Sequence, residues 1–208
     1  ELPSPWLRVQ LLEAQDGALW LIGHNQDAAR LDISTTQWRS YEGLAYWCET
    51  QDGSEWFIAH PDRRVVRRHA GEWTQYGPED GLLDASARLL VSRTGELWAT
   101  GRRDSMAAIA RFDGVRWAHM KFPALAYGTK ASFEDRKGRI WFFALEADAR
   151  AGHTGGVVRL GPPGVHRGGG SRTEFGNREV RILRPPEFPV RNNVYGIAQT
   201  DDGHLWAG

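Results

Sequence analysis

A phrase ending in Gly-x-x-Trp recurs at intervals of 36 to 65 residues along this 208-residue chain. Each copy has an apolar run, then a polar turn with the Gly, then a second apolar run carrying the Trp. Successive tryptophans lie 36, 42, 43 and 65 residues apart, at Trp20, Trp56, Trp98, Trp141 and Trp206. A period near 40 residues, made of short apolar runs and tight turns, indicates a repeated β unit too small to bury its own face. We therefore expect an array of packed β units.

The third copy shows the content of one unit. Its apolar runs are residues 87–91, 96–100, 108–112 and 115–120, and the segments between them have turn or loop composition. Residues 101–105 are expected to be a polar loop, and Asp113-Gly114 is a strong hairpin signal. Four short strands in one repeat predict a four-stranded antiparallel sheet, which is the blade of a β-propeller.

The expected fold is therefore all-β, with four full blades at residues 1–42, 43–78, 79–121 and 122–187 and the first two strands of a fifth at 188–208. We expect the repeat tryptophans to pack between adjacent blades. The turn glycines that accompany them are Gly17, Gly53, Gly95, Gly138 and Gly203. A partial ring leaves an open edge, so we expect the remainder of a longer chain to complete the propeller.

Blade four departs from the pattern because a Gly/Pro-rich insert, residues 161–177, precedes its fourth strand at 179–183. The insert has few apolar groups to offset the entropy of ordering it. We expect a mobile surface loop there, with a ligand- or partner-binding loop as the alternative.

Charge and composition exclude several classes of function. The 26 basic and 26 acidic residues balance, which argues against nucleic-acid binding, and no apolar run is long enough to suggest membrane contact by this segment. Cys48 is the only cysteine, so we expect a buried structural thiol. The seven histidines show no metal-ligand spacing, and the Asp-Gly turns lack a calcium ladder. No metal or cofactor is expected.

The repeat resembles a known family. Residues 192–206, NNVYGIAQTDDGHLW, resemble the two-component regulator propeller repeat most closely, and Gly81-Leu82-Leu83-Asp84 and Glu42-Gly43-Leu44 fit its lead-in. Glu55 departs from the pattern, because it replaces the Leu that precedes the Trp. The resemblance implies a periplasmic or extracytoplasmic sensor module of bacterial hybrid histidine kinases, often responding to glycan fragments. Nothing in this chain resembles the kinase domains themselves.

Carboxylates recur on the innermost strands. Glu13, Glu49 and Glu134 each lie four residues before the repeat Gly, and converging carboxylates are how glycosidases arrange acid and base. However, the same position holds Val91 and Gln199 in the other copies. Hydrogen bonds to turn amides explain the position better, so we expect no catalytic residue in this set.

A ligand site is expected on the loops around the central channel. Arg63-Arg64 and Arg102-Arg103 lie on matching loops of neighbouring blades, where they are expected to clamp one anionic group. Segments leading into the inner strands add Tyr46, Tyr127, Arg191 and Asn192. A solvated rim of mixed charge is the alternative.

The leading functional hypothesis is a non-catalytic recognition module that binds an oligosaccharide or another small molecule. The rivals are a propeller enzyme, either a polysaccharide lyase or a glycosidase, and a protein-protein interaction scaffold.

Overall fold

The computed structural model describes residues 9–23, 27–126, 131–144, 156–164, 173–183 and 197–207. Within these ranges the regular structure is antiparallel β-strand, apart from one 3₁₀ turn at Pro78–Asp80. The predicted all-β class is thus confirmed. The chain divides into two compact units, Glu1–Gly77 and Pro78–Gly208.

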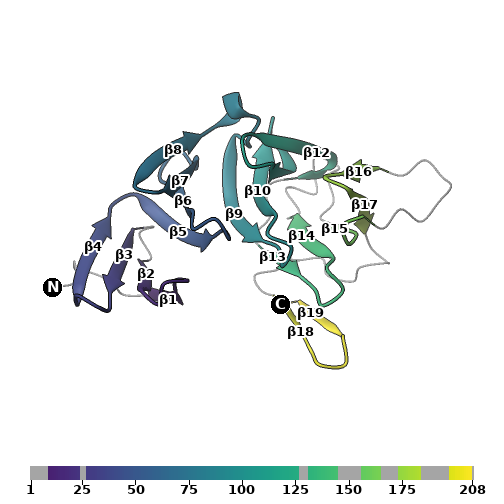
Figure 1. The fold of residues 1–208 in the computed structure, drawn as a ribbon. Helices are drawn as coiled ribbons and strands as arrows, with labels where there is room; N and C mark the ends of the chain where they lie inside the picture. The colour runs from purple at the N-terminus through teal and green to yellow at the C-terminus, as the bar shows by residue number, and fades with distance from the viewer. Residues whose placement is uncertain are drawn as a thin grey trace. The chain divides into compact units, whose positions relative to one another are not determined.

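The first unit contains two four-stranded sheets in which each strand pairs with the next (Figure 1). The first sheet consists of β1 (Val9–Glu13), β2 (Leu19–Gly23), β3 (Ala28–Asp32) and β4 (Gln37–Tyr41). The second consists of β5 (Leu44–Glu49), β6 (Glu55–Ala59), β7 (Val65–His69) and β8 (Glu72–Tyr76).

The second unit contains one four-stranded sheet, one five-stranded sheet and a two-stranded hairpin. The four-stranded sheet comprises β9 (Ala85–Val91), β10 (Leu97–Arg103), β11 (Met106–Phe112) and β12 (Trp117–Ala126). The five-stranded sheet comprises β13 (Ala131–Glu134), β14 (Ile140–Ala144), β15 (Gly156–Leu160), β17 (Arg178–Leu183) and β16 (Glu174–Phe175). The hairpin comprises β18 (Ile197–Gln199) and β19 (Leu205–Ala207).

The repeat glycines close the turn between the first two strands of every sheet. All five have positive φ, between 72° and 91°, a conformation that costs glycine little because it has no Cβ. In each turn the glycine N–H donates to the carbonyl three residues earlier, at distances of 2.8–2.9 Å. The repeat phrase therefore specifies one tight turn through residues that are close in sequence.

Apolar faces of successive sheets pack on each other around the repeat tryptophans. Trp20 stacks on Tyr46 of the next sheet with ring centroids 4.2 Å apart. Trp98 packs against Phe142 and Phe175 of the five-stranded sheet. Of the five tryptophans, Trp20, Trp56, Trp98 and Trp141 are at most 8% exposed. Trp206 departs from the expected packing because it is 67% exposed.

In two copies the residue three positions before the repeat Gly accepts the indole N–H, whereas in the third copy Ser92 occupies this position and Trp98 Nε1 has no hydrogen-bond partner. Thr50 Oγ1 accepts from Trp56 Nε1 at 2.9 Å, and Asp135 Oδ2 accepts from Trp141 Nε1 at 2.9 Å. Ala14 occupies this position in the first copy and offers no acceptor, and the buried Trp20 Nε1 has no hydrogen-bond partner.

One local expectation is wrong. The segment 101–105 is mostly strand, because β10 continues to Arg103 and only Asp104-Ser105 form the turn, both with positive φ. Residues 165–172 of the insert lie outside the described residues, so the mobile loop stays a prediction. The end of the insert forms β16, which pairs with β17. Phe175 of β16 caps Trp98 in a T-shaped contact, and this apolar anchor offsets the cost of ordering.

Candidate functional site

Of the three inner-strand carboxylates, Glu49 and Glu134 lie in contacts between sheets, whereas Glu13 is exposed. Glu49 Oε2 accepts the backbone N–H of Gln15 at 2.7 Å, and Glu134 Oε2 accepts that of Arg93 at 2.7 Å. Gln199 Oε1 accepts the N–H of Arg136 at 2.8 Å. In every case the donor lies two residues before the repeat Gly of the preceding sheet. The expected bond to a turn amide is confirmed for Glu49 and Glu134, and the turn belongs to the neighbouring sheet.

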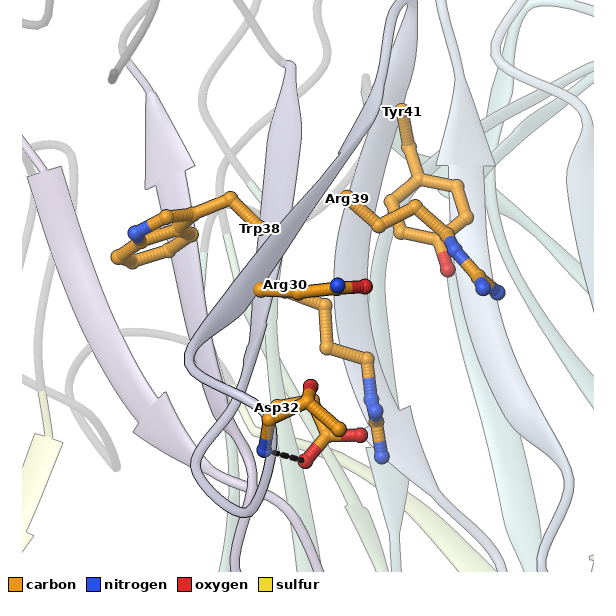
Figure 2. Close-up of a pocket in the computed structure, with 7 residues that line it drawn as sticks. Arg30, Asp32, Trp38, Arg39 and Tyr41 are labelled. Atoms are coloured by element: carbon orange, nitrogen blue, oxygen red, sulfur yellow. Dashed lines mark hydrogen bonds between the residues drawn. The ribbon is translucent and has the colours of Figure 1, made fainter.

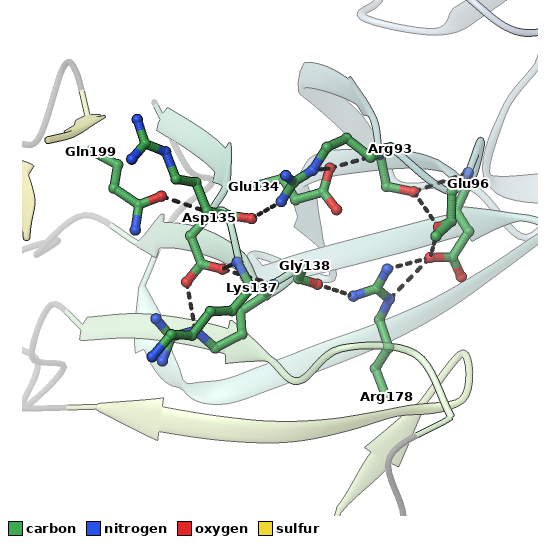
Figure 3. Close-up of polar contacts among 12 residues, drawn as sticks. Arg93, Glu96, Glu134, Asp135, Lys137, Gly138, Arg178 and Gln199 are labelled. Carbon is green, nitrogen blue, oxygen red and sulfur yellow. Dashed lines mark hydrogen bonds and ion pairs between the residues drawn. The ribbon is translucent and has the colours of Figure 1, made fainter. Parts of the chain in front are cut away.

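The side chain of the same donor residue also donates a hydrogen bond to a backbone carbonyl in the next sheet (Figure 3). Arg93 Nη2 donates to the Asp135 carbonyl. Arg136 Nη1 donates to the Asp201 carbonyl at 3.0 Å. Gln15 Nε2 reaches the Thr50 carbonyl at 3.4 Å. We call this reciprocal pair of contacts the turn joint. In each joint, the side chain four residues before one repeat Gly accepts a hydrogen bond. The donor is the backbone N–H two residues before the repeat Gly of the preceding sheet.

The turn joint leaves little freedom for acid-base chemistry at these positions. The Glu134 side chain is 8% exposed and also lies 3.6 Å from Arg93 Nε. Burial raises the pKa of Glu49, while the hydrogen bond from the Gln15 amide opposes that rise. Each carboxylate is therefore fixed in the packing between two sheets.

A second polar cluster fixes the hairpin at the start of β11, where the predicted ligand residues of the second unit lie. Arg103 Nη1 donates to the Leu82 carbonyl at 2.7 Å, and Arg103 Nε lies 3.4 Å from Asp84 Oδ1. Asp84 Oδ2 accepts the Asp104 N–H at 2.7 Å. The Lys121 ammonium donates to Asp104 at 2.9 Å and lowers the pKa of that carboxyl.

The two arginines of this hairpin differ in whether their guanidinium groups have partners within the protein. Arg103 is held by Leu82 and Asp84, whereas Arg102 on the same strand is exposed. Within the described part of the chain, the Arg102 side chain forms no ion pair or hydrogen bond. Arg102 is thus a cation available to an external anion on a strand end that Asp84 makes rigid.

The matching loop of the first unit is also fastened by a carboxylate. Asp62 Oδ1 accepts the Arg64 N–H at 3.2 Å, and Asp62 Oδ2 lies 3.7 Å from Arg64 Nε. Arg63 has a φ of 62°, and burial lowers its pKa. Because Arg63 and Arg64 belong to the other unit, the clamp shared with Arg102 and Arg103 stays a prediction.

The remaining predicted ligand residues have different outcomes. Tyr46 is 4% exposed and its ring is stacked on Trp20, so that ring is part of the core. Tyr127, Arg191 and Asn192 lie outside the described residues.

Sequence reasoning did not identify a shallow polar pocket on the outer strands of the first sheet (Figure 2). Arg30 on β3 and Arg39 on β4 are directly opposite each other, and the hydroxyl of the buried Tyr41 has no hydrogen-bond partner. Arg30 is already paired with Asp16 and lies 3.5 Å from Glu55 Oε1. Figure 2 shows the Trp38 ring on the other side of the hairpin from Arg39 and Tyr41.

Among the described residues, no group of three or more His, Cys, Asp or Glu side chains is placed to hold a metal ion. Burial raises the pKa of the Cys48 thiol to about 12, which keeps it protonated and unreactive at neutral pH. No helix in the described ranges is long and apolar enough to cross a membrane.

Comparisons with known proteins identify the fold. No protein-family model matches the chain, and no curated protein matches it by sequence. Virginiamycin B lyase from Staphylococcus aureus superposes with a TM-score of 0.67 at 17% identity, over 99% of this chain and 64% of the lyase. The extracellular domain of a hybrid two-component system from B. thetaiotaomicron superposes with a TM-score of 0.63 at 13% identity, over 100% of this chain and 27% of that one.

This chain has a β-propeller fold. Its antiparallel sheets are blades, and the open set of sheets fits part of a propeller. The chain spans less than two thirds of either propeller named above. These structural neighbours include both a lyase and the extracellular domain of a hybrid two-component system.

Proposed function

We propose that this chain is a ligand-recognition segment of an extracytoplasmic sensor propeller in a bacterial two-component-type signalling protein. It binds a ligand and does not transform it. Further blades from a longer chain complete the ring, and any kinase activity resides in other domains. The likeness to the sensor domain from B. thetaiotaomicron supports this proposal, as does the resemblance of the repeat.

The observation that carries the non-catalytic part is the turn joint. A glycosidase needs two carboxyl groups free to exchange protons with substrate. Here Glu49 and Glu134 each accept a backbone N–H from the neighbouring blade, and the third position of the joint is the amide Gln199. An amide cannot act as an acid or a base, and it makes the same contact. Packing between blades is therefore sufficient to explain why hydrogen-bond acceptors occupy these positions.

The proposed ligand is an acidic oligosaccharide such as a uronic-acid fragment. Arg102 presents an exposed guanidinium at the end of β10, on a hairpin that Asp84 and Arg103 hold in place. A guanidinium binds a carboxylate through two parallel hydrogen bonds, and a rigid support lowers the entropy lost on binding. Arg63 and Arg64 are proposed as further cations for the same ligand class.

Calorimetry against neutral and acidic oligosaccharides tests this proposal. We expect acidic fragments to bind and Arg102→Ala to weaken binding roughly ten- to hundredfold. Arg116→Ala is the matched control, because Arg116 is an exposed arginine beyond the opposite end of β11. Equal affinities of the wild type and Arg102→Ala would remove Arg102 from the site.

A propeller enzyme is the second candidate, favoured by the likeness to virginiamycin B lyase. The same oligosaccharide incubations distinguish it from the sensor. Release of unsaturated or shortened products would support a lyase or a glycosidase, whereas binding with unchanged substrate supports recognition.

A further inference from the structure

Arg39 and Tyr41 line the shallow polar pocket on the first sheet (Figure 2). They are two residues apart on β4, so their side chains leave the sheet on the same face. The centroid of the Tyr41 ring lies 5.8 Å from that of Phe57 and 5.9 Å from that of Trp73, both on the second blade. The first and second blades belong to one unit. This face of β4 is therefore the one that the second blade covers, whatever precedes the first blade.

Two buried polar atoms of this pocket lack a hydrogen-bond partner in the described part of the chain. Tyr41 is 8% exposed, and its hydroxyl is one of these atoms. The other is Arg30 Nε, which lies 3.5 Å from Glu55 Oε1 as an ion pair without a hydrogen bond. A buried hydroxyl without a partner costs about 1–3 kcal/mol. A ligand that accepts a hydrogen bond from Tyr41 would recover part of this cost.

The charges around the pocket favour a ligand with a single negative charge. Arg39 is exposed, and its side chain makes no ion pair or hydrogen bond with any residue in the described ranges. Arg30 is already paired with Asp16. Asp32 also lines the pocket, and a hydrogen bond from the Ser34 hydroxyl lowers its pKa, so this carboxylate is ionised at neutral pH. Arg39 therefore supplies one uncompensated positive charge, and Asp32 opposes the entry of a doubly charged anion.

We propose that this pocket binds the carboxylate of a small organic acid. The planar guanidinium of Arg39 donates two parallel hydrogen bonds to the carboxylate. The Tyr41 hydroxyl donates a third and so gains the partner that it lacks within the protein. Because no contact holds the Arg39 side chain, it can move to admit the ligand to the buried hydroxyl and then close over it. The site uses residues of the first unit alone and does not rest on the ligand proposed for Arg102.

Nuclear magnetic resonance of the arginine Nε–Hε groups tests binding at this residue. The Arg39 signal is assigned by its loss in Arg39→Ala. Titration with D-glucuronate should shift this signal saturably, whereas D-glucose, which has a hydroxymethyl group in place of the carboxylate, should leave it unchanged. Sulfate should bind roughly tenfold more weakly than glucuronate, because Asp32 repels its second charge. Equal affinities for sulfate and glucuronate would overturn the proposal, and so would the absence of any shift with glucuronate.

Calorimetry with D-glucuronate measures the part of each side chain, in an Arg102→Ala background so that the hairpin of the second unit contributes no heat. Arg39→Ala should weaken binding roughly ten- to hundredfold, and Tyr41→Phe roughly tenfold. Tyr41→Phe should not lower the urea midpoint, because the hydroxyl it removes makes no hydrogen bond in the free protein. Arg116→Ala is the matched control, since Arg116 is an exposed arginine outside the pocket, and it should bind as the background does. Unchanged affinity in either pocket variant would contradict the proposal.

Discussion

Arg178 is predicted to be the largest single polar contributor to the packing of blades three and four. Its side chain is fully buried, and its guanidinium donates to Glu96 Oε2 through Nε at 3.0 Å and Nη2 at 2.5 Å (Figure 3). Nη1 donates to the carbonyls of Gly138 at 2.7 Å and Gly161 at 2.8 Å. The guanidinium also lies 5.9 Å from the ring centroid of Trp98. One side chain therefore links two blades and satisfies two carbonyls.

Replacing Arg178 with Met keeps much of the apolar stem and removes all four hydrogen bonds. Removing one partner of a buried ion pair costs about 3–5 kcal/mol, because the other charge stays buried. Glu96 keeps a second partner, since Arg111 Nε lies 3.0 Å from its Oε1, which favours the lower end of this range. The carbonyls of Gly138 and Gly161 lose the guanidinium donor, which favours the upper end. We expect a loss of about 3–5 kcal/mol.

Urea unfolding followed by tryptophan fluorescence measures the loss, with the m-value checked for each variant. Arg181→Met is the matched control, because Arg181 is an exposed arginine on the same strand, and it should change stability by less than about 0.5 kcal/mol. A double-mutant cycle with Glu96→Gln should give a coupling energy of about 1.5–3 kcal/mol. A coupling energy near zero, or equal effects of the two arginine substitutions, would show that Arg178 does not stabilise the packing of these blades through Glu96.

The remaining predictions are all read by urea or acid unfolding. Trp98→Ala should cost about 3–5 kcal/mol, because a fully buried indole is lost. Ala14→Thr should stabilise the first blade by about 0.5–1.5 kcal/mol, since it supplies the missing indole acceptor, and no gain would contradict this. Gly101→Ala should cost about 1–3 kcal/mol, because its Cβ would lie 2.0 Å from the Ala85 carbonyl oxygen. For Asp52, burial opposes ionisation, but hydrogen bonds from Thr50 and Ser54 and the charge of Arg67 outweigh it and lower the pKa from 3.8 to about 2. Its ionised form therefore stabilises the fold above about pH 4, and this contribution is lost as the pH falls towards 2. Asp52→Asn should show a smaller loss of stability over that interval.

The sequence determined the elements that depend on neighbouring residues. The positive φ at each repeat Gly and the apolar runs on both sides of the turn are local features, and five copies of one phrase repeat them. The all-β class and the four buried repeat tryptophans followed from this pattern. The joint acceptors Glu49 and Glu134 were also recognisable as turn-amide partners from their fixed distance to the Gly.

Only the tertiary structure decided which neighbouring blade each side chain contacts. The repeat does not reveal that Glu134 reaches the turn of the preceding blade, or that Arg178, beside a Gly-rich insert, joins Glu96 from 82 residues away. It also does not separate Arg102 from Arg103, which are neighbours in sequence but differ because only Arg103 meets Leu82 and Asp84. Local periodicity fixes backbone conformation and the alternation of faces. Contacts between sheets depend on how whole faces pack, and that arrangement involves residues too far apart for a local pattern to specify.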